Sequence, residues 1–234
     1  MSYYTNYIPA VLIPVLFQAA CYGQVSYRVD FDVTWSADTH PGAYPIDAHF
    51  SPLIGTTHDD SVSFWEPGGI ASDGIEQMAE TGGTGGLAGE IAAATGRRTR
   101  ITSSSIFGTG RRSAVFSAEP DESLITLVTM VAPSPDWFVG VSGLELRPGG
   151  MWTNSLTVDL FAWDAGTDSG ADFNSDDFDT VPRTPIALLG EPLPNTAPPL
   201  GTFTFTLLTV PEPSSWLLGV SCCLAGMGRR TRAF

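Results

Sequence analysis

The sequence predicts an all-β fold, an antiparallel β-sandwich with one or two short helices. The 25 glycines and 18 prolines among 234 residues favour many turns over long helices. Hydrophobic residues make up 43% of the chain, which is enough to build a core. Short segments with the period-two alternation of strands recur between clusters of turn residues. No repeat or boundary divides the body, so we expect one sandwich domain over residues 24–209.

The first predicted strand covers residues 25–35 (VSYRVDFDVTW), where apolar and polar residues alternate. Residues 36–60 follow and are rich in Pro, Gly and His. Their three prolines exclude a continuous helix or a central strand, because proline lacks the backbone N–H that both require. Residues 61–68 are then predicted to form a short strand that ends at a Pro-Gly-Gly turn.

Helix is predicted in two pieces, residues 70–81 and 87–95, separated by the break TGGTGG. Ser72 has the right type and place for an N-cap. One face of the first helix is apolar: Ile75, Met78 and Ala79.

A cluster of arginines follows the predicted helices and flanks the polar segment 101–110. Its members are Arg97, Arg98, Arg100, Arg111 and Arg112. In an otherwise acidic chain this cluster could meet an anionic polymer, but we favour the interpretation that it keeps loops soluble.

The remaining strands are predicted from residue 123 onward. Residues 123–133 are almost continuously apolar and β-branched, which indicates a buried central strand. Residues 136–146, interrupted by Gly143, and residues 156–163 supply two more strands. The last strands are expected at 181–189 and, with clean alternation, at 202–210.

Charge and cysteine content exclude several classes of function. The net charge is −14 and every basic residue is arginine, so nucleic acid, which requires a basic face, is not an expected partner. An acidic surface suits solubility and divalent cations. The cysteines are Cys21, Cys222 and Cys223, so residues 24–210 can form no disulfide, thiolate metal site or cysteine nucleophile.

Both ends of the chain have the composition of targeting segments. Residues 1–23 contain an apolar run, IPAVLIPVLFQAA, that ends in small residues, as in a secretory signal peptide. They contain no Lys or Arg, which departs from the usual pattern, and lipidation at Cys21 is an alternative processing route. Residues 210–234 combine Pro211-Glu212-Pro213, a 13-residue apolar span and an arginine cluster.

The apolar span of the C-terminal segment is shorter than the ~20 residues that cross a bilayer comfortably. The order of its three parts resembles the PEP-CTERM sorting signal of Gram-negative bacteria. This resemblance implies an exosortase-type sorting machinery as partner, only a transient membrane contact, and export to the cell surface or extracellular matrix.

The sequence LFAWDAGTDSGAD, residues 160–172, is the strongest candidate for a binding site. Asp164 and Asp168 follow an apolar run and lie among glycines, and Asp136 opens another apolar run upstream. Calcium takes 6–8 oxygen ligands, so three carboxylates together with carbonyls and water could hold it. Spacing alone leaves a metal site and a turn rich in Asp and Gly equally open.

Four blocks of the sequence resemble the spondin domain, the N-terminal module of a group of animal extracellular-matrix proteins. They are THPGAYPIDAHFSPLIGTTHDD, FWEPGGIASDGIEQMAETG, SPDWFVGVSGLEL and DAGTDSG, in the order of the family. The resemblance implies a C2-like β-sandwich, calcium as cofactor with Asp136, Asp164 and Asp168 as ligands, and an adhesive, non-enzymatic function. The disulfides of the animal domains have no counterpart in this cysteine-free body, and their integrin partner does not carry over.

Other sites and functions remain as alternatives. Residues 172–179 (DFNSDDFD) faintly resemble an EF-hand loop and could add a calcium ligand, although glycine is missing at the sixth place. His40, His49 and His58 would suit zinc, and a hydrolase built on it, but their nine-residue intervals match no short zinc-ligand spacing. We expect a surface protein or polysaccharide as the partner. A calcium-dependent contact with lipid or polysaccharide is the second functional hypothesis.

Overall fold

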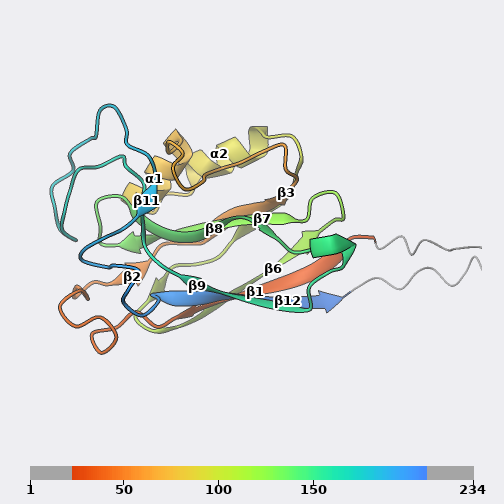
Figure 1. Ribbon diagram of the computed structural model, residues 1–234, viewed down its shortest axis with the longest axis horizontal. Helices are drawn as coiled ribbons and strands as arrows, with labels where there is room; N and C mark the ends of the chain where they lie inside the picture. Colours follow the sequence, from red (N-terminus) through yellow and green to blue (C-terminus); the bar gives the residue numbers. More distant parts are fainter. Residues whose placement is uncertain (1–22, 210–234) are drawn as a thin grey trace, which may run out of the picture. The chain divides into compact units, whose positions relative to one another are not determined.

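The computed structural model describes residues 23–209, which fold into two β-sheets packed face to face with two helices on one side (Figure 1). The smaller sheet has the strand order β6-β1-β12-β9 and is antiparallel throughout. Its strands are β6 (Gly110–Ala118), β1 (Val25–Val33), β12 (Gly201–Thr209) and β9 (Ser155–Leu160). The prediction of an all-β antiparallel sandwich with short helices is confirmed.

The larger sheet is built around the long strands β7 (Leu124–Ala132) and β8 (Trp137–Glu145). On the side of β8 it continues through β10 (Trp163–Asp164) to β11 (Ala187–Leu188). On the side of β7, two short strands share the length of that strand: β2 (His49–Phe50) pairs with one end and β3 (Ile54–His58) with the other. Beyond them lie β5 (Ile106–Phe107) and β4 (Arg97–Thr102).

The main core lies between the two sheets and follows from the alternation predicted for β1. Tyr27, Val29 and Phe31 are fully buried on its inner side, and Phe31 lies opposite Phe203 of β12 in the antiparallel register. The Phe31 and Phe203 rings meet edge to face, with centroids 5.1 Å apart. Each such buried side chain contributes roughly 1.5–3 kcal/mol of transfer free energy, so the sandwich is held by its core.

Helices α1 (Asp73–Thr81) and α2 (Gly85–Ala93) cover the outer face of the larger sheet (Figure 1). The Ser72 side chain accepts a hydrogen bond from the Ile75 N–H, as the N-cap prediction requires. A second apolar cluster joins the helices to β7 and β8 through Ile75, Met78, Leu87, Ile91, Val128 and Phe138. This layer places the C-terminal end of α1 over one rim of the sheet.

Five of the sequence-based expectations for local structure are wrong, among them the strand expected at 181–189, of which only Ala187–Leu188 forms a strand, β11. Residues 61–68 form turns and no strand, whereas residues 54–58, expected as loop, are the buried strand β3. Pro52 precedes β3 and therefore removes no hydrogen bond from it. The arginine-rich residues 97–112 contain strands and not only loops. The predicted strand 156–163 divides into β9 and β10, which belong to different sheets.

The two predicted targeting segments, residues 1–23 and 210–234, lie outside the described residues except for Gly23. Within residues 23–209, no helix is both long and apolar enough to cross a membrane.

Candidate metal centre

Two of the three predicted ligands are brought together by the pairing of β10 with β8. Asp136 directly precedes β8, and Asp164 ends β10, opposite Trp137. The Ala165 N–H continues this pairing by donating to the Asp136 carbonyl oxygen at 3.2 Å. The switch of the chain from β9 to β10 is therefore what carries Asp164 to the rim where Asp136 lies.

The Asp136 side chain is completely buried, with an exposed fraction of 0%. Its Oδ2 accepts hydrogen bonds from the Thr167 N–H at 2.7 Å, the Asp168 N–H at 3.1 Å and the Thr167 hydroxyl at 3.3 Å. Its Oδ1 is buried and has no hydrogen-bond partner. A buried carboxylate oxygen without a partner is costly, so this atom marks a place where a cation would be stabilising.

Asp164 and Asp168 are bound to the loop that they belong to. Asp164 Oδ1 accepts from the Gly166 N–H at 2.7 Å, and Asp168 Oδ2 accepts from the Phe178 N–H at 2.8 Å. Gly166 has φ +73°, and a Cβ there would lie 2.2 Å from the Thr184 carbonyl oxygen. Only glycine fits this position, which sets the turn between the two aspartates.

The pKa shifts show that like charges are close together here. Burial, followed by the charge of Asp164, raises the pKa of Asp136 from 3.8 to about 6, against the lowering effect of its hydrogen bonds. Burial also raises the pKa of Asp164; the Gly166 N–H opposes this rise, and the charge of Asp168 adds to it. The three carboxyl groups thus form a chain of repelling charges.

Glu80, at the end of α1, is a member of this acidic group that the sequence analysis missed. Its Oε1 is buried without a hydrogen-bond partner. Burial raises its pKa, the Thr167 hydroxyl opposes the rise, and the charges of Glu76, Asp177 and Asp136 add to it. The only signal in the sequence was its place next to the apolar face of the first helix, which gives no hint of a binding role.

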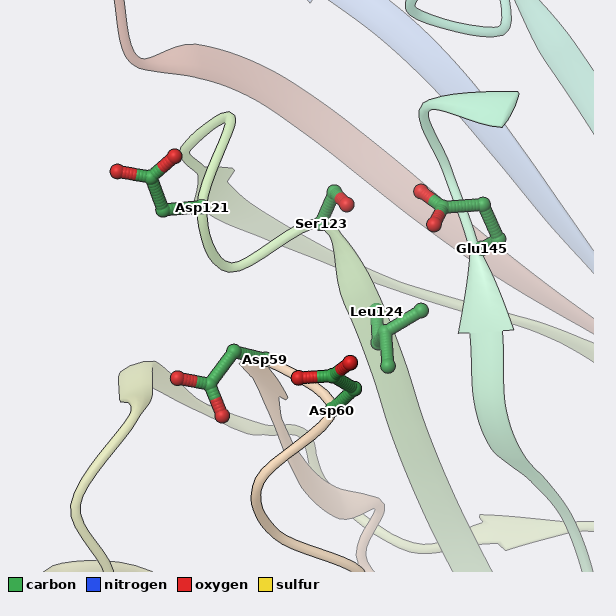
Figure 2. Close-up of a pocket in the computed structure, with 6 residues that line it drawn as sticks. All are labelled: Asp59, Asp60, Asp121, Ser123, Leu124 and Glu145. Atoms are coloured by element: carbon green, nitrogen blue, oxygen red, sulfur yellow. The ribbon is translucent and has the colours of Figure 1, made fainter. Parts of the chain in front are cut away.

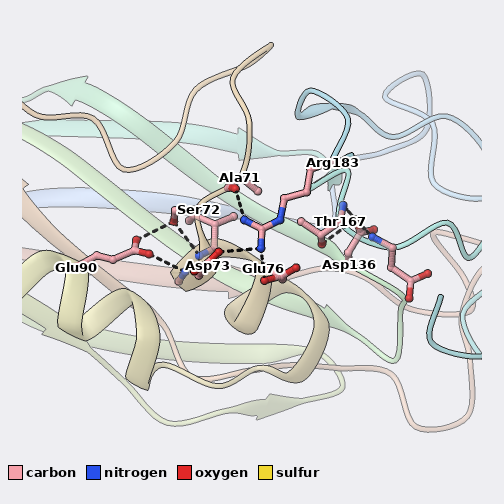
Figure 3. A network of polar contacts seen from close by, with 11 residues as sticks. Ala71, Ser72, Asp73, Glu76, Glu90, Asp136, Thr167 and Arg183 are labelled. Carbon is pink, nitrogen blue, oxygen red and sulfur yellow. Dashed lines mark hydrogen bonds and ion pairs between the residues drawn. The ribbon is translucent and has the colours of Figure 1, made fainter. Parts of the chain in front are cut away.

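An ion-pair network fastens the segment after the acidic loop to α1. Figure 3 shows Arg183 reaching Ala71, Asp73 and Glu76 near Asp136. The guanidinium donates to the Ala71 carbonyl oxygen at 2.9 Å and to the carboxylates of Asp73 at 2.8 Å and Glu76 at 2.5 Å. These contacts hold the acidic loop and the helix that carries Glu80 against each other.

The residues of this rim fit a hard cation in donor type and charge. Two buried carboxylate oxygens lack partners, and oxygen donors are what calcium requires. Among residues 23–209, however, no three His, Cys, Asp or Glu side chains converge closely enough to form a ready-made metal site. The side chains of Asp164 and Asp168 face backbone N–H groups instead. These N–H groups satisfy Asp164 and Asp168 but leave Asp136 Oδ1 and Glu80 Oε1 without partners, and those two atoms are where a cation would be stabilising.

A second acidic cluster lines a pocket beside the first residue of β7 and the last residue of β8 (Figure 2). Its lining residues are Asp59, Asp60, Asp121, Ser123, Leu124 and Glu145. Asp59 accepts hydrogen bonds from the Ser61 backbone and side chain, and these bonds lower its pKa. No unpaired buried oxygen points to a ligand among these lining residues.

The three histidines serve local structure and lie in different hydrogen-bond environments. His40 bridges the Thr39 hydroxyl and the Pro198 carbonyl oxygen, each at 2.9 Å. His49 contacts the carbonyl oxygen of Asp47, and His58 contacts the Thr126 hydroxyl. Within residues 23–209 these histidines form no metal-binding group of three, so the structure gives zinc no support at them.

The segment that resembles an EF-hand loop, residues 172–179, contacts the acidic rim through its last residues. Asp179 forms an isolated β-bridge with Asp168. Desolvation and the charge of Asp168 raise the pKa of Asp177. The segment therefore adds negative charge beside Asp168.

The sequence model of the Spondin_N family matches residues 25–198, which is most of the described body and includes all three aspartates. The chain belongs to the spondin N-terminal domain family. The family resemblance inferred from the four sequence blocks is thereby confirmed.

Individual spondins are similar to this spondin domain over most of its length. Rat spondin-2 is 36% identical over 170 residues, 68% of this chain and 51% of that protein. Human spondin-2 is 35% identical with the same coverage, 68% and 51%. Rat spondin-1 is 36% identical over 184 residues, 74% of this chain and 23% of that protein. The chain thus spans about half the length of its spondin-2 relatives.

Proposed function

We propose that this spondin-domain protein is an exported, calcium-binding module for adhesion to a surface or extracellular matrix. The observation that carries the calcium proposal is the completely buried Asp136, whose Oδ1 has no partner and whose neighbour is another carboxylate. Membership of the spondin family supports the adhesive role. The mechanism is binding and involves no chemical transformation.

Calcium would be held by the carboxylates of Asp136, Asp164 and Asp168. When bound, it supplies positive charge and accepts 6–8 oxygen ligands, so carbonyl groups and water complete its shell. The chain's own residues prepare the site. The Thr167 and Asp168 N–H groups orient Asp136, and Gly166 allows the turn that returns Asp168 to the rim.

The absence of cysteine from residues 24–209 gives calcium a structural role as well. No disulfide can fasten the acidic loop to the sandwich. A cation that joins Asp136 to the loop would order that rim by linkage, because it binds the folded state alone.

Thermal unfolding with and without calcium tests this proposal. At a calcium concentration of 100 times Kd, linkage adds about 2.7 kcal/mol to the free energy of unfolding. For a domain of this size, that corresponds to a rise in Tm of roughly 5–10 °C. The double variant Asp164→Asn, Asp168→Asn should lose the rise.

The matched control is Asp60→Asn with Asp121→Asn, which removes the same charge from the other acidic cluster and should keep the full rise. An unchanged Tm of the unaltered protein in millimolar calcium would remove the calcium claim. Attachment of cells to a surface coated with the protein, with and without a chelator, tests the adhesive role separately.

We also propose that residues 210–234 are a sorting segment processed by an exosortase. The ordered combination of Pro-Glu-Pro, apolar span and arginine cluster supports this proposal. Replacing Arg229, Arg230 and Arg232 with glutamine should leave the protein uncleaved and retained in the membrane fraction. Normal release of that variant to the medium would contradict the proposal.

A calcium-dependent contact with lipid is the second candidate function. Phe178 and Val181 follow the acidic loop with exposed fractions of 59% and 86%, and Phe178 binds Asp168 through its N–H. Exposed apolar side chains beside a cation site could enter a lipid surface. Flotation with phosphatidylserine vesicles in calcium should then be lost in Phe178→Ser with Val181→Ser, whereas Met151→Ser should float normally.

A further inference from the structure

Arginine is concentrated on one side of an acidic molecule. Residues 23–209 contain 8 arginines, and five of them fall between residues 97 and 112. The structure places these five on β4 and β6, which lie side by side although they belong to different sheets. The prediction that they sit in solvating loops was wrong, so their position needs another explanation.

Both arginine-bearing strands are edge strands. Among the described residues, β4 pairs only with β3, and β6 pairs only with β1. The edges of the two sheets therefore meet along one side of the sandwich. We call this side the arginine edge, made of β4 and β6 with residues 103–109 between them.

Two of the guanidinium groups on the arginine edge are not neutralised by a carboxylate. Arg111 forms a bidentate ion pair with Asp32, at 2.6 and 2.9 Å. Arg112 is exposed and donates only to the carbonyl oxygens of Ser105 and Arg111, within the described residues. Arg100 is exposed, and its guanidinium makes no hydrogen bond or ion pair with any described residue.

An exposed aromatic platform lies in the segment that joins the two strands. Phe107 of β5 is 70% exposed, and its ring stacks on His49 of β2 with centroids 4.7 Å apart and an angle of 20° between the rings. β5 also contacts β6. The open face of such a ring suits the C–H groups of a sugar ring, since the aromatic face is electron-rich.

We propose that the arginine edge binds an acidic polysaccharide, with its carboxylate or sulfate groups on Arg100 and Arg112 and a sugar ring on Phe107. Arginine presents a planar fork that matches a carboxylate or a sulfate, and every basic residue of this chain is arginine. Binding needs no calcium, so this inference goes beyond the proposed calcium function and does not depend on it. It names a chemical class for the partner of the adhesion module.

Charged residues on edge strands also discourage pairing between molecules. That role requires charge alone and gives no reason for an exposed aromatic ring beside the arginines. The two explanations are separated by binding measurements that vary the charge and the ring independently.

The experiment measures binding of the full chain to polygalacturonate in EDTA at 50 mM and 300 mM NaCl, by biolayer interferometry. The unaltered protein should bind at 50 mM NaCl and more weakly at 300 mM, because salt screens exposed charges. Arg100→Gln with Arg112→Gln should weaken binding at least tenfold. Arg28→Gln with Arg147→Gln, which changes the net charge equally, should weaken it less than twofold.

The aromatic platform is tested with a second polyanion. Phe107→Ser should weaken binding to polygalacturonate at least threefold and leave binding to inorganic polyphosphate unchanged, because polyphosphate has no sugar ring. Circular dichroism and Tm establish that each variant is folded.

Three results would overturn the proposal. The first is that the unaltered protein does not bind polygalacturonate in EDTA. The second is that the Arg100/Arg112 variant and the Arg28/Arg147 variant lose equal affinity for polygalacturonate. The third is that the unaltered protein binds polyphosphate or phosphatidylglycerol vesicles as tightly as polygalacturonate, or more tightly. If the unaltered protein binds no polysaccharide and the variant Arg100→Gln with Arg112→Gln aggregates, the arginines serve to protect the sheet edges from pairing.

Discussion

Two acidic clusters in this molecule have similar composition, but they shift the pKa of their aspartates in opposite directions. The rim around Asp136 buries that carboxylate, leaves oxygens of Asp136 and Glu80 unpaired and raises the pKa of Asp136 and Asp164. In the second cluster, Asp60, Asp121 and Glu145 are exposed and Asp59 is half-buried, and hydrogen bonds from Ser61 lower the pKa of Asp59. The number of acidic residues is therefore a poor guide to a cation site. The informative feature is negative charge that the protein itself leaves unsatisfied.

Removing the charge of Asp136 should change stability more than any substitution in the other cluster. In Asp136→Asn, the buried charge is gone while the amide oxygen can still accept from Thr167 and Asp168. The rise of the Asp136 pKa from 3.8 to about 6 corresponds to roughly 3 kcal/mol of unfolding free energy at most. We therefore expect the calcium-free variant to gain about 1–3 kcal/mol in unfolding free energy at pH 7 and to lose its response to calcium.

Urea unfolding with and without EDTA measures this effect. Asp59→Asn is the control from the other cluster, and it should not gain stability, because its surroundings favour the charged carboxylate. A loss of stability in calcium-free Asp136→Asn would show that the buried charge is already compensated.

The raised pKa of Asp136 predicts how stability depends on pH. The folded-state pKa of Asp136 is about 6 and its ordinary value is 3.8, so the folded state holds the extra proton between these values. Without calcium, the contribution of Asp136 to stability is thus complete below pH 3.8 and is lost as the pH rises through 6. Calcium binds the deprotonated form, so the stabilisation by calcium should grow between pH 5 and pH 7.

Thermal unfolding at pH 5, 6 and 7 checks this sign. The difference between the unaltered protein and Asp136→Asn isolates the contribution of this one group. A calcium-induced rise in Tm that is as large at pH 5 as at pH 7 would contradict the assignment of Asp136 as a ligand.

Thr167 offers a smaller test, because its hydroxyl lies between the carboxylates of Asp136 and Glu80. Thr167→Val keeps the shape and removes one hydrogen bond to Asp136, which should cost about 1 kcal/mol. The backbone N–H bonds to Asp136 remain, so calcium should still bind, with an affinity reduced several-fold. Thr57→Val, which removes another largely buried hydroxyl far along the chain, is the control for stability alone.

The smallest effect is expected in the second cluster. Asp60→Asn with Asp121→Asn changes exposed carboxylates and should shift the unfolding free energy by less than about 0.5 kcal/mol. Calcium titration of this variant should match that of the unaltered protein. A clear loss of calcium affinity would move the site to this pocket.

The sequence predicted the fold class and the local features around the candidate site, and it missed the features that depend on tertiary contacts. Asp136 opens an apolar run, and Asp164 and Asp168 follow one; this pattern made the three aspartates candidates, because the ends of strands are a local property of the sequence. Ser72 and the alternation of β1 were predictable for the same reason. The division of residues 156–163 between two sheets was not, since a change of sheet depends on packing that no local pattern encodes.

Glu80 was not predicted either, because its place beside Asp136 also depends on packing. It comes near Asp136 only because α1 packs on the larger sheet, 56 positions earlier in the chain than its neighbour. β3 was missed because prolines before it suggested a loop, although its own residues contain none. Tertiary contacts decide both features.

Calorimetric titration of calcium into the two double variants shows which of the two acidic clusters binds calcium. We predict one calcium per chain for the unaltered protein and for Asp60→Asn with Asp121→Asn. Asp164→Asn with Asp168→Asn should give no binding heat at the same calcium concentrations. Calcium binding that persists in Asp164→Asn with Asp168→Asn, or that is lost in Asp60→Asn with Asp121→Asn, would contradict a calcium site at the rim around Asp136.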